Sequence, residues 1–123
     1  MTKNNHQIRY WAGGTGMTKT SILSVLRMEG FDPHVWFGQD GDVYPLNTVP
    51  YQRIIWVAEG ALTVQLPEQG QEFELQPGDR LDLPAGIPHV SMVSAEPLIC
   101  VEARRYVSDR SSTADLSTKE LLG

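Results

Sequence analysis

Residues 78–89 read GDRLDLPAGIPH, and this stretch decides the fold of the chain. Gly78 and Asp79 are typical of a turn in which glycine supplies a positive φ, and residues 80–83 alternate polar and apolar as a short strand does. Residues 84–88 form a second turn that two prolines make rigid. His89 then enters the next strand. Two turns separated by a short strand indicate antiparallel β structure.

The chain on either side of this stretch continues the pattern of short strands and turns from residue 34 onward. Glu59-Gly60 and residues 68–70 are predicted to be tight hairpin turns. Many short strands at regular spacing favour an all-β barrel or sandwich over a parallel sheet. We expect strands near 34–37, 42–46, 52–58, 61–66, 71–75, 80–83, 89–93 and 98–105.

The two ends of the chain have a different character. Apolar residues in 18–29 have the spacing of an amphipathic helix, with a threonine to cap it and Gly30 to end it. We expect an N-terminal arm and helix over 1–33, the arm having little structure of its own. A barrel domain is expected over 34–106. A flexible tail is expected over 107–123, with a weak helix at 118–122.

Composition excludes several classes of protein. The net charge is −5, and between residues 34 and 105 the acids outnumber four arginines, so no basic stripe exists to bind nucleic acid or an anionic membrane surface. No apolar run approaches the length of a membrane span, and the first ten residues lack the apolar core of a secretory signal. One cysteine, Cys100, rules out an internal disulfide and is expected to be buried. We expect a cytoplasmic protein.

The spacing of Gly78, Pro84, Gly86 and His89 resembles the second sequence motif of the cupin family. The resemblance extends over residues 43–105 and implies a cupin-type double-stranded β-helix, the jelly-roll barrel, with the short N-terminal helix as an addition. In cupins the histidine of this motif usually binds a metal inside the barrel. Cupins are also commonly dimers, so the resemblance implies a homodimer.

The first cupin motif is matched in spacing but not in metal ligands. It ends in a glycine, matched by Gly60, and counting back places Arg53 at the family's glutamate and Asn47 and Val49 at its two histidines. Valine has no donor, arginine is a permanent cation, and asparagine is a weak neutral donor. Only His89 is retained. We therefore expect no metal and no other cofactor.

Strand alternation predicts a pocket inside the barrel. If Arg53 points inward, so do Ile55 and Val57, and if His89 points inward, so does Ser91. Apolar walls with a few convergent donors suit a small molecule, and an inward Arg53 would favour a carboxylate or phosphate. With the register shifted by one residue, Gln52 and Trp56 would point inward instead. The predicted pocket residues are Asn47, Arg53, Ile55, Val57, His89 and Ser91.

These residues also have purely structural interpretations. Arg53 is at a position where it would pair with Glu102, Glu59 or Asp82 at the barrel rim, and His89 would hold its turn by hydrogen bonding. Trp36, Trp56 and Tyr51 are predicted to form an outer aromatic patch, which would mark the dimer interface.

Three functions stay open. The first is metal-independent binding or sensing of an unknown small molecule. The second is a small cupin enzyme, an isomerase or epimerase or a dioxygenase-like enzyme, in which His89 acts as acid, base or residual metal ligand. Without a metal, that enzyme needs a carboxylate to orient His89, from Asp82 or Glu102, and a phenol such as Tyr44 as acid. The third is a structural, partner-binding protein.

Overall fold

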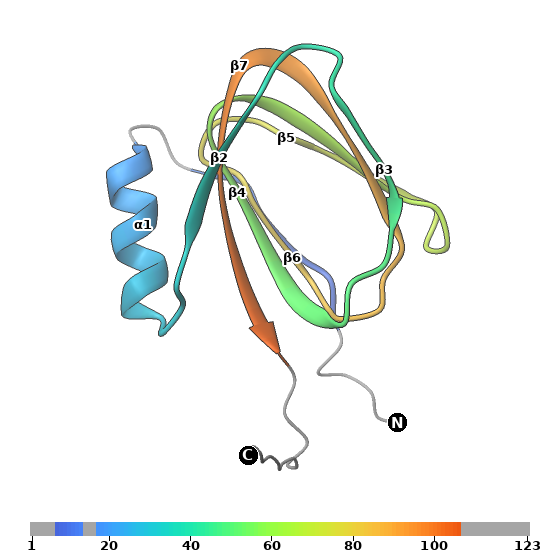
Figure 1. Cartoon of the computed structure of the whole chain (residues 1–123), viewed down its shortest axis with the longest axis horizontal. Helices are drawn as coiled ribbons and strands as arrows, with labels where there is room; N and C mark the ends of the chain where they lie inside the picture. Colours follow the sequence, from blue (N-terminus) through green and yellow to red (C-terminus); the bar gives the residue numbers. More distant parts are fainter. Residues whose placement is uncertain (1–6, 14–16, 107–123) are drawn as a thin grey trace.

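A computed structural model describes residues 7–13 and 17–106 of the chain. These residues form one helix and seven strands (Figure 1). In chain order they are β1 (Arg9–Trp11), α1 (Lys19–Met28), β2 (His34–Gly38), β3 (Val43–Asn47), β4 (Tyr51–Leu66), β5 (Gln71–Leu75), β6 (Arg80–Leu83) and β7 (His89–Tyr106).

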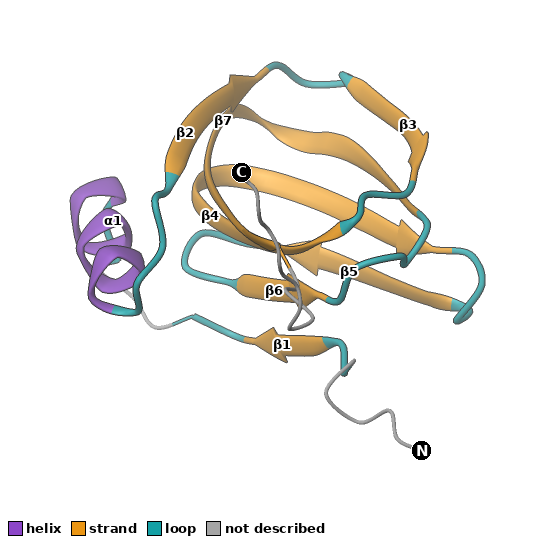
Figure 2. Ribbon diagram, turned by 60° about the horizontal axis from the view of Figure 1, so that its bottom comes forward, coloured by secondary structure: helices purple, strands orange, loops and turns teal. Residues whose placement is uncertain are grey.

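All strand pairs are antiparallel, and the sheet curves into a barrel (Figure 2). The main strand order is β1-β6-β4-β7-β2, with β3 added to β7 and β5 added to β4. The long strands β4 and β7 pair along most of their length and hold the barrel together. The predicted all-β jelly roll with a short N-terminal helix is confirmed.

The two turns predicted within residues 78–89 are also confirmed. Gly78 has φ +94° and Gly86 has φ +84°, and the four residues of β6 lie between the two turns. The predicted hairpin turn at 68–70 joins β4 to β5, with Leu66 opposite Gln71. Such turns depend on local residue types, so they can be predicted from the sequence alone.

The predicted hairpin at Glu59-Gly60 is wrong. β4 runs through these residues, and β7 runs likewise through 94–97, so two expected pairs of short strands are two long bent strands. The register between them shifts around Glu59 and Ala61, as at a β-bulge. Gly60 has φ +77°, and a Cβ there would lie 2.5 Å from the carbonyl oxygens of Ala95 and Pro97. Glycine therefore marks close contact between two strands rather than a turn.

The helix forms where it was expected. The Thr18 hydroxyl oxygen accepts a hydrogen bond from Ser21 N at 3.1 Å and caps the first turn, and Gly30 follows the last turn with φ +94°. Ile22 and Leu26 are fully buried against the outer side of the barrel, with Trp56 and Val101 among their partners. The helix therefore covers one outer face and leaves the interior to other residues.

A second apolar cluster fills much of the barrel interior. It includes Leu62, Leu81, Leu98 and Cys100, all fully buried. Burial raises the pKa of the Cys100 thiol to about 12, so this cysteine is a protonated, unreactive packing group. Its predicted burial is confirmed.

The arm contributes a strand that the sequence did not predict. β1 pairs with β6, and Asp79 fixes it by accepting hydrogen bonds from the Tyr10 hydroxyl at 2.9 Å and the Gly13 amide at 2.7 Å. The expected tail over 107–123, with its helix at 118–122, lies outside the described residues. No helix among the described residues combines the length and apolarity that a membrane crossing needs.

Candidate functional site

A cavity of about 600 Å³ opens inside the barrel between β2, β3, β4 and β7. We call it the barrel pocket. Its walls combine aromatic and apolar groups with a small set of charged and polar side chains. Its lining residues are His34, Trp36, Tyr44, Pro45, Leu46, Asn47, Arg53, His89, Ser91, Glu102 and Arg104.

Strand pairing explains why these residues meet. On β7, His89 and Ser91 are buried, while Met92 between Ser91 and Val93 is exposed, so alternation aims the first two inward. Asn47 of β3 lies opposite His89. On the other side, Arg53 of β4 lies opposite Arg104 of β7. The pocket is therefore assembled from strands that are far apart in the sequence.

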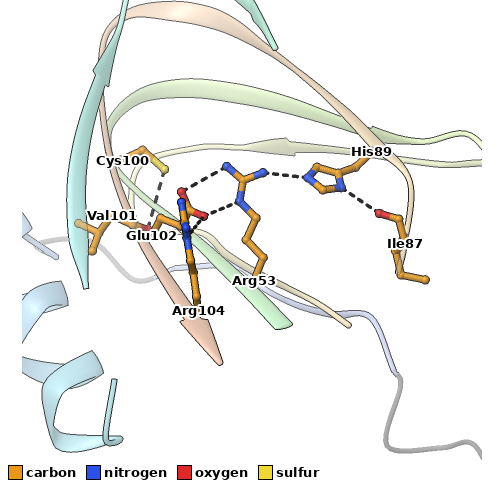
Figure 3. Close-up of polar contacts among 7 residues, drawn as sticks. All are labelled: Arg53, Ile87, His89, Cys100, Val101, Glu102 and Arg104. Carbon is orange, nitrogen blue, oxygen red and sulfur yellow. Dashed lines mark hydrogen bonds and ion pairs between the residues drawn. The ribbon is translucent and has the colours of Figure 1, made fainter. Parts of the chain in front are cut away.

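Arg53 lies at the centre of a chain of polar contacts (Figure 3). Its Nε donates to Glu102 Oε2 at 2.8 Å, and its Nη2 donates to Glu102 Oε1 at 3.3 Å. Its Nη1 lies 2.8 Å from His89 Nε2. The guanidinium thus joins the carboxylate to the imidazole. The predicted rim pairing of Arg53 with Glu102 and its predicted inward position are both present.

The contacts of His89 define its protonation state. Nδ1 lies 2.9 Å from the Ile87 carbonyl oxygen, which only accepts, so Nδ1 carries the proton. Nε2 then accepts from Arg53. Burial lowers the pKa of His89 and the Arg53 cation lowers it further, which together outweigh the Ile87 carbonyl and Glu102. His89 is therefore a neutral imidazole whose lone pair is occupied.

The barrel pocket carries a net positive charge. Glu102 is the only carboxylate among its lining residues, and its side chain is 8% exposed. It accepts from Arg53 and also from Arg104 Nε at 3.3 Å. Arg104 is 47% exposed and lies over the Tyr51 ring, so it borders the pocket mouth. Two guanidinium groups against one carboxylate, beside neutral His89, leave one positive charge.

Four of the predicted pocket residues line the barrel pocket: Asn47, Arg53, His89 and Ser91. Ile55 and Val57 point into the barrel as predicted, but they belong to the apolar cluster that fills it and do not line the pocket. The alternative register is excluded, because Gln52 and Trp56 line a cavity on the outer side.

Tyr44, named from the sequence as a candidate acid, lines the pocket, although strand alternation did not place it there. Counting by twos from Asn47 predicts Pro45 inward, as observed, and Tyr44 outward or at the mouth. The pairing of β3 with β7 is irregular between Tyr44 and Asn47, so Tyr44 lies opposite the inward Ser91 as Asn47 lies opposite His89. A bulge of this kind is set by the neighbouring strand and has no local signal in the sequence.

The predicted outer aromatic patch does not exist as a unit. Trp36 of β2 lines the barrel pocket and packs edge-to-face on Tyr44, with ring centroids 5.1 Å apart. Trp56 packs under the helix, and Tyr51 contacts Tyr106 and Arg104. His34, which lacks a nearby partner in the sequence, also lines the pocket because it is opposite Glu102 in the register of β2 and β7.

The second cavity, of about 590 Å³, lies on the outer side of the sheet beside β1 and β6. Its central cation, Arg80, donates four of its five N–H groups to two carboxylates. It forms ion pairs with Asp82 at 2.8 Å and Glu29 at 2.9 Å, and its guanidinium lies between the rings of Trp11 and Trp56. This arrangement joins the arm, the helix and the barrel. The barrel pocket, which contains His89 of the second cupin-like motif, is therefore the candidate functional site.

The contacts of His89 bear on its two catalytic roles considered from the sequence, as an acid or base and as a metal ligand. Asp82 lies on the outer side with Arg80, and Glu102 reaches His89 only through the Arg53 guanidinium. Neither carboxylate is hydrogen-bonded to the imidazole, and Tyr44 shares the pocket without a hydrogen bond to it. Among the described residues, no group of three or more His, Cys, Asp or Glu side chains is arranged to hold a metal ion.

The described residues therefore form a curved antiparallel barrel with a polar pocket inside, as in jelly-roll proteins. No protein-family model matches the chain, and no curated protein matches it by sequence. Solved structures do resemble it.

The polyketide cyclase RemF from Streptomyces resistomycificus is 25% identical with a TM-score of 0.52, over 63% of this chain and 60% of RemF. KdgF from a Halomonas species is 20% identical with a TM-score of 0.53, over 63% and 71% of the two chains. An RmlC-like cupin from Shewanella frigidimarina is 15% identical with a TM-score of 0.53, over 65% and 70%. The chain therefore has the cupin-type jelly-roll fold.

Proposed function

We propose that this chain is a metal-independent small-molecule-binding protein in which Arg53 provides the positive charge that a metal ion provides in other cupins. One observation carries the proposal: the guanidinium lies between His89 and Glu102 and occupies Nε2, the imidazole atom free to bind a metal. The cation is thereby built into the chain.

The donor set supports this proposal. Val49 has no donor atom and does not line the barrel pocket, and Arg53 repels a cation. Asn47 lines the pocket, but its Oδ1 already accepts from the Thr48 amide at 2.9 Å. A divalent ion needs three or four converging donors, and these residues do not supply them.

Enzymes occur among the structural neighbours, RemF being a polyketide cyclase. For this chain we rank binding above catalysis, because His89 has its lone pair engaged by a cation and has no carboxylate partner. A general base needs a free lone pair within reach of the proton that it takes up, and Nε2 of His89 is engaged by Arg53.

The first arm of the test measures metal affinity. Calorimetric titration of purified protein with Zn²⁺, Ni²⁺, Mn²⁺ and Fe²⁺ should show no stoichiometric site, and metal analysis should find well under one equivalent. The positive control is the variant Asn47→His/Arg53→Glu, which places two metal donors in the pocket together with His89. About half an equivalent or more of metal in the wild type, lost in His89→Ala, would refute metal independence.

The second arm measures ligand binding in the presence of a chelator. Thermal shift assays over carboxylates, sugars and phosphates should find at least one class that raises the melting temperature of the wild type and not of Arg53→Gln. If no class does so, the binding proposal fails.

The homodimer and the cytoplasmic location remain predictions. Light scattering would measure the mass of the protein in solution and so test the homodimer.

A further inference from the structure

The barrel pocket has donors without partners. A guanidinium has five N–H groups, and Arg53 uses three of them, on Nε, Nη1 and Nη2, for Glu102 and His89. Within the described residues, one N–H on Nη1 and one on Nη2 have no acceptor. The Trp36 indole Nε1 is buried and also has no partner within 7–13 and 17–106. The two free Arg53 N–H groups belong to a side chain that is 20% exposed, so oxygen atoms of a ligand in the pocket can accept from them.

The charge balance restricts the class of anion. The pocket has one net positive charge, from Arg53 and Arg104 against Glu102. A carboxylate monoanion matches this charge and offers two oxygens to guanidinium donors. A phosphate dianion would bring a second negative charge close to the Glu102 carboxylate, which accepts from two arginines. The pocket therefore favours a monoanion.

The walls restrict the rest of the ligand. Trp36 and Tyr44 form an edge-to-face aromatic pair beside the charged end of the pocket, with their ring planes at 80°. Because the two rings are at right angles, a third aromatic ring can pack on the face of one of them and against the edge of the other. Pro45 and Leu46 add apolar surface on β3.

Resting on the function proposed above, we infer that the ligand is a planar aromatic monocarboxylate, whose carboxylate lies on Arg53 and Arg104 and whose ring packs on Trp36 and Tyr44. The volume of about 600 Å³ admits a molecule larger than a single ring, so simple benzoates are probes of the class.

The test uses the full chain and five probes: benzoate, 4-hydroxybenzoate, cyclohexanecarboxylate, benzamide and phenyl phosphate. Calorimetry or a fluorescence titration should give benzoate or 4-hydroxybenzoate a Kd at least about tenfold lower than the Kd values of cyclohexanecarboxylate, benzamide and phenyl phosphate. A difference of this size corresponds to one favourable contact. In NMR spectra the Trp36 indole signal should shift, while the signals of Trp11 and Trp56 stay in place.

Two neighbouring arginines provide a matched pair of variants. Arg104 lines the pocket at its mouth, whereas Arg105 lies on the outer side, over the Phe31 ring. Arg104→Gln should weaken benzoate binding about tenfold, and Arg105→Gln should leave it within about twofold. Both changes remove one charge from the surface, so a purely long-range effect would weaken binding equally in both and would refute the inference.

The remaining outcomes separate this inference from the function on which it rests. Equal binding of cyclohexanecarboxylate would overturn the aromatic assignment. Binding of phenyl phosphate or sugars without benzoate would overturn the carboxylate assignment and leave small-molecule binding intact. If no probe and no member of the wider ligand panel binds, both the inference and the proposed function fail.

Discussion

The Nη1 atom of Arg53 and the Nε2 atom of His89 lie 2.8 Å apart, with the guanidinium donating and the imidazole accepting. The contact joins β4 to β7 across the interior of the barrel. It engages the lone pair of the one good metal ligand that the sequence retains. The histidine is thus part of a polar network whose charged members are Arg53, Glu102 and Arg104.

Arg53→Gln should lower the free energy of unfolding by about 1–3 kcal/mol, because it leaves the buried Glu102 carboxylate with Arg104 alone. Urea denaturation would measure this. Arg104→Gln is the control, and its cost should stay below about 1 kcal/mol because that side chain is half exposed. The double variant Arg53→Gln/Glu102→Gln should be less destabilised than the sum of its single changes. Additive effects would show that the pair is not coupled.

The stability of the protein should decrease as the pH falls below the ordinary histidine range. The pKa of His89 is lowered in the native state, so below about pH 6.5 the unfolded state takes up a proton that the folded state resists. Each pH unit in this window costs up to about 1.4 kcal/mol. His89→Gln should show a smaller slope between pH 7 and pH 5, since the other histidines are common to both proteins. Equal slopes would contradict the assigned neutral state.

Gly60→Ala should be strongly destabilising. Alanine must adopt φ +77°, which costs about 1–3 kcal/mol, and its Cβ would meet two backbone carbonyl oxygens of β7 at 2.5 Å. Gly70→Ala is the matched control, because φ there is +62° with nothing within 4 Å of the added Cβ. Thermal unfolding should show the larger loss for Gly60→Ala. Equal losses of stability in the two variants would mean that the close contact of β4 with β7 at Gly60 does not contribute to stability.

Asp79→Ala should release the arm from the barrel. Asp79 accepts hydrogen bonds from the Tyr10 hydroxyl and the Gly13 and Gln76 amides, so its loss leaves three donors unpaired. Hydrogen exchange of the β1 amides should quicken markedly. Tyr10→Phe removes one of these bonds and should cost about 1 kcal/mol or less. Unchanged exchange in Asp79→Ala would show that pairing with β6 alone holds the strand.

Local chemistry made much of the fold predictable. The turns around Gly78 and residues 68–70 and the capped helix from Thr18 rest on residues adjacent in the chain, and all three are confirmed. Glu59-Gly60 has the same local character, yet it lies inside a strand. Its partner is β7, some 35 residues away, whose close approach requires glycine there.

The candidate site was predictable only in part. Alternation along single strands correctly aimed Arg53, His89 and Ser91 into one pocket. It failed for Tyr44, because the bulge in β3 is visible only from the pairing with β7. It could not place Trp36, because nothing in the sequence around β2 shows that this strand adds to β7 with Trp36 opposite Cys100.

The sequence by itself determined the turns around Gly78 and residues 68–70 and the alternation along the strands. It also showed that the metal ligands of the cupin motifs are not retained, since each of these features depends on residue types at fixed spacing. Tertiary structure decided what the remaining residues do. Arg53, His89 and Glu102 belong to two strands, and Trp36 and Tyr44 to two others, so their meeting depends on strand order and register. Pairing between distant segments sets both of these, and no short stretch of sequence encodes it.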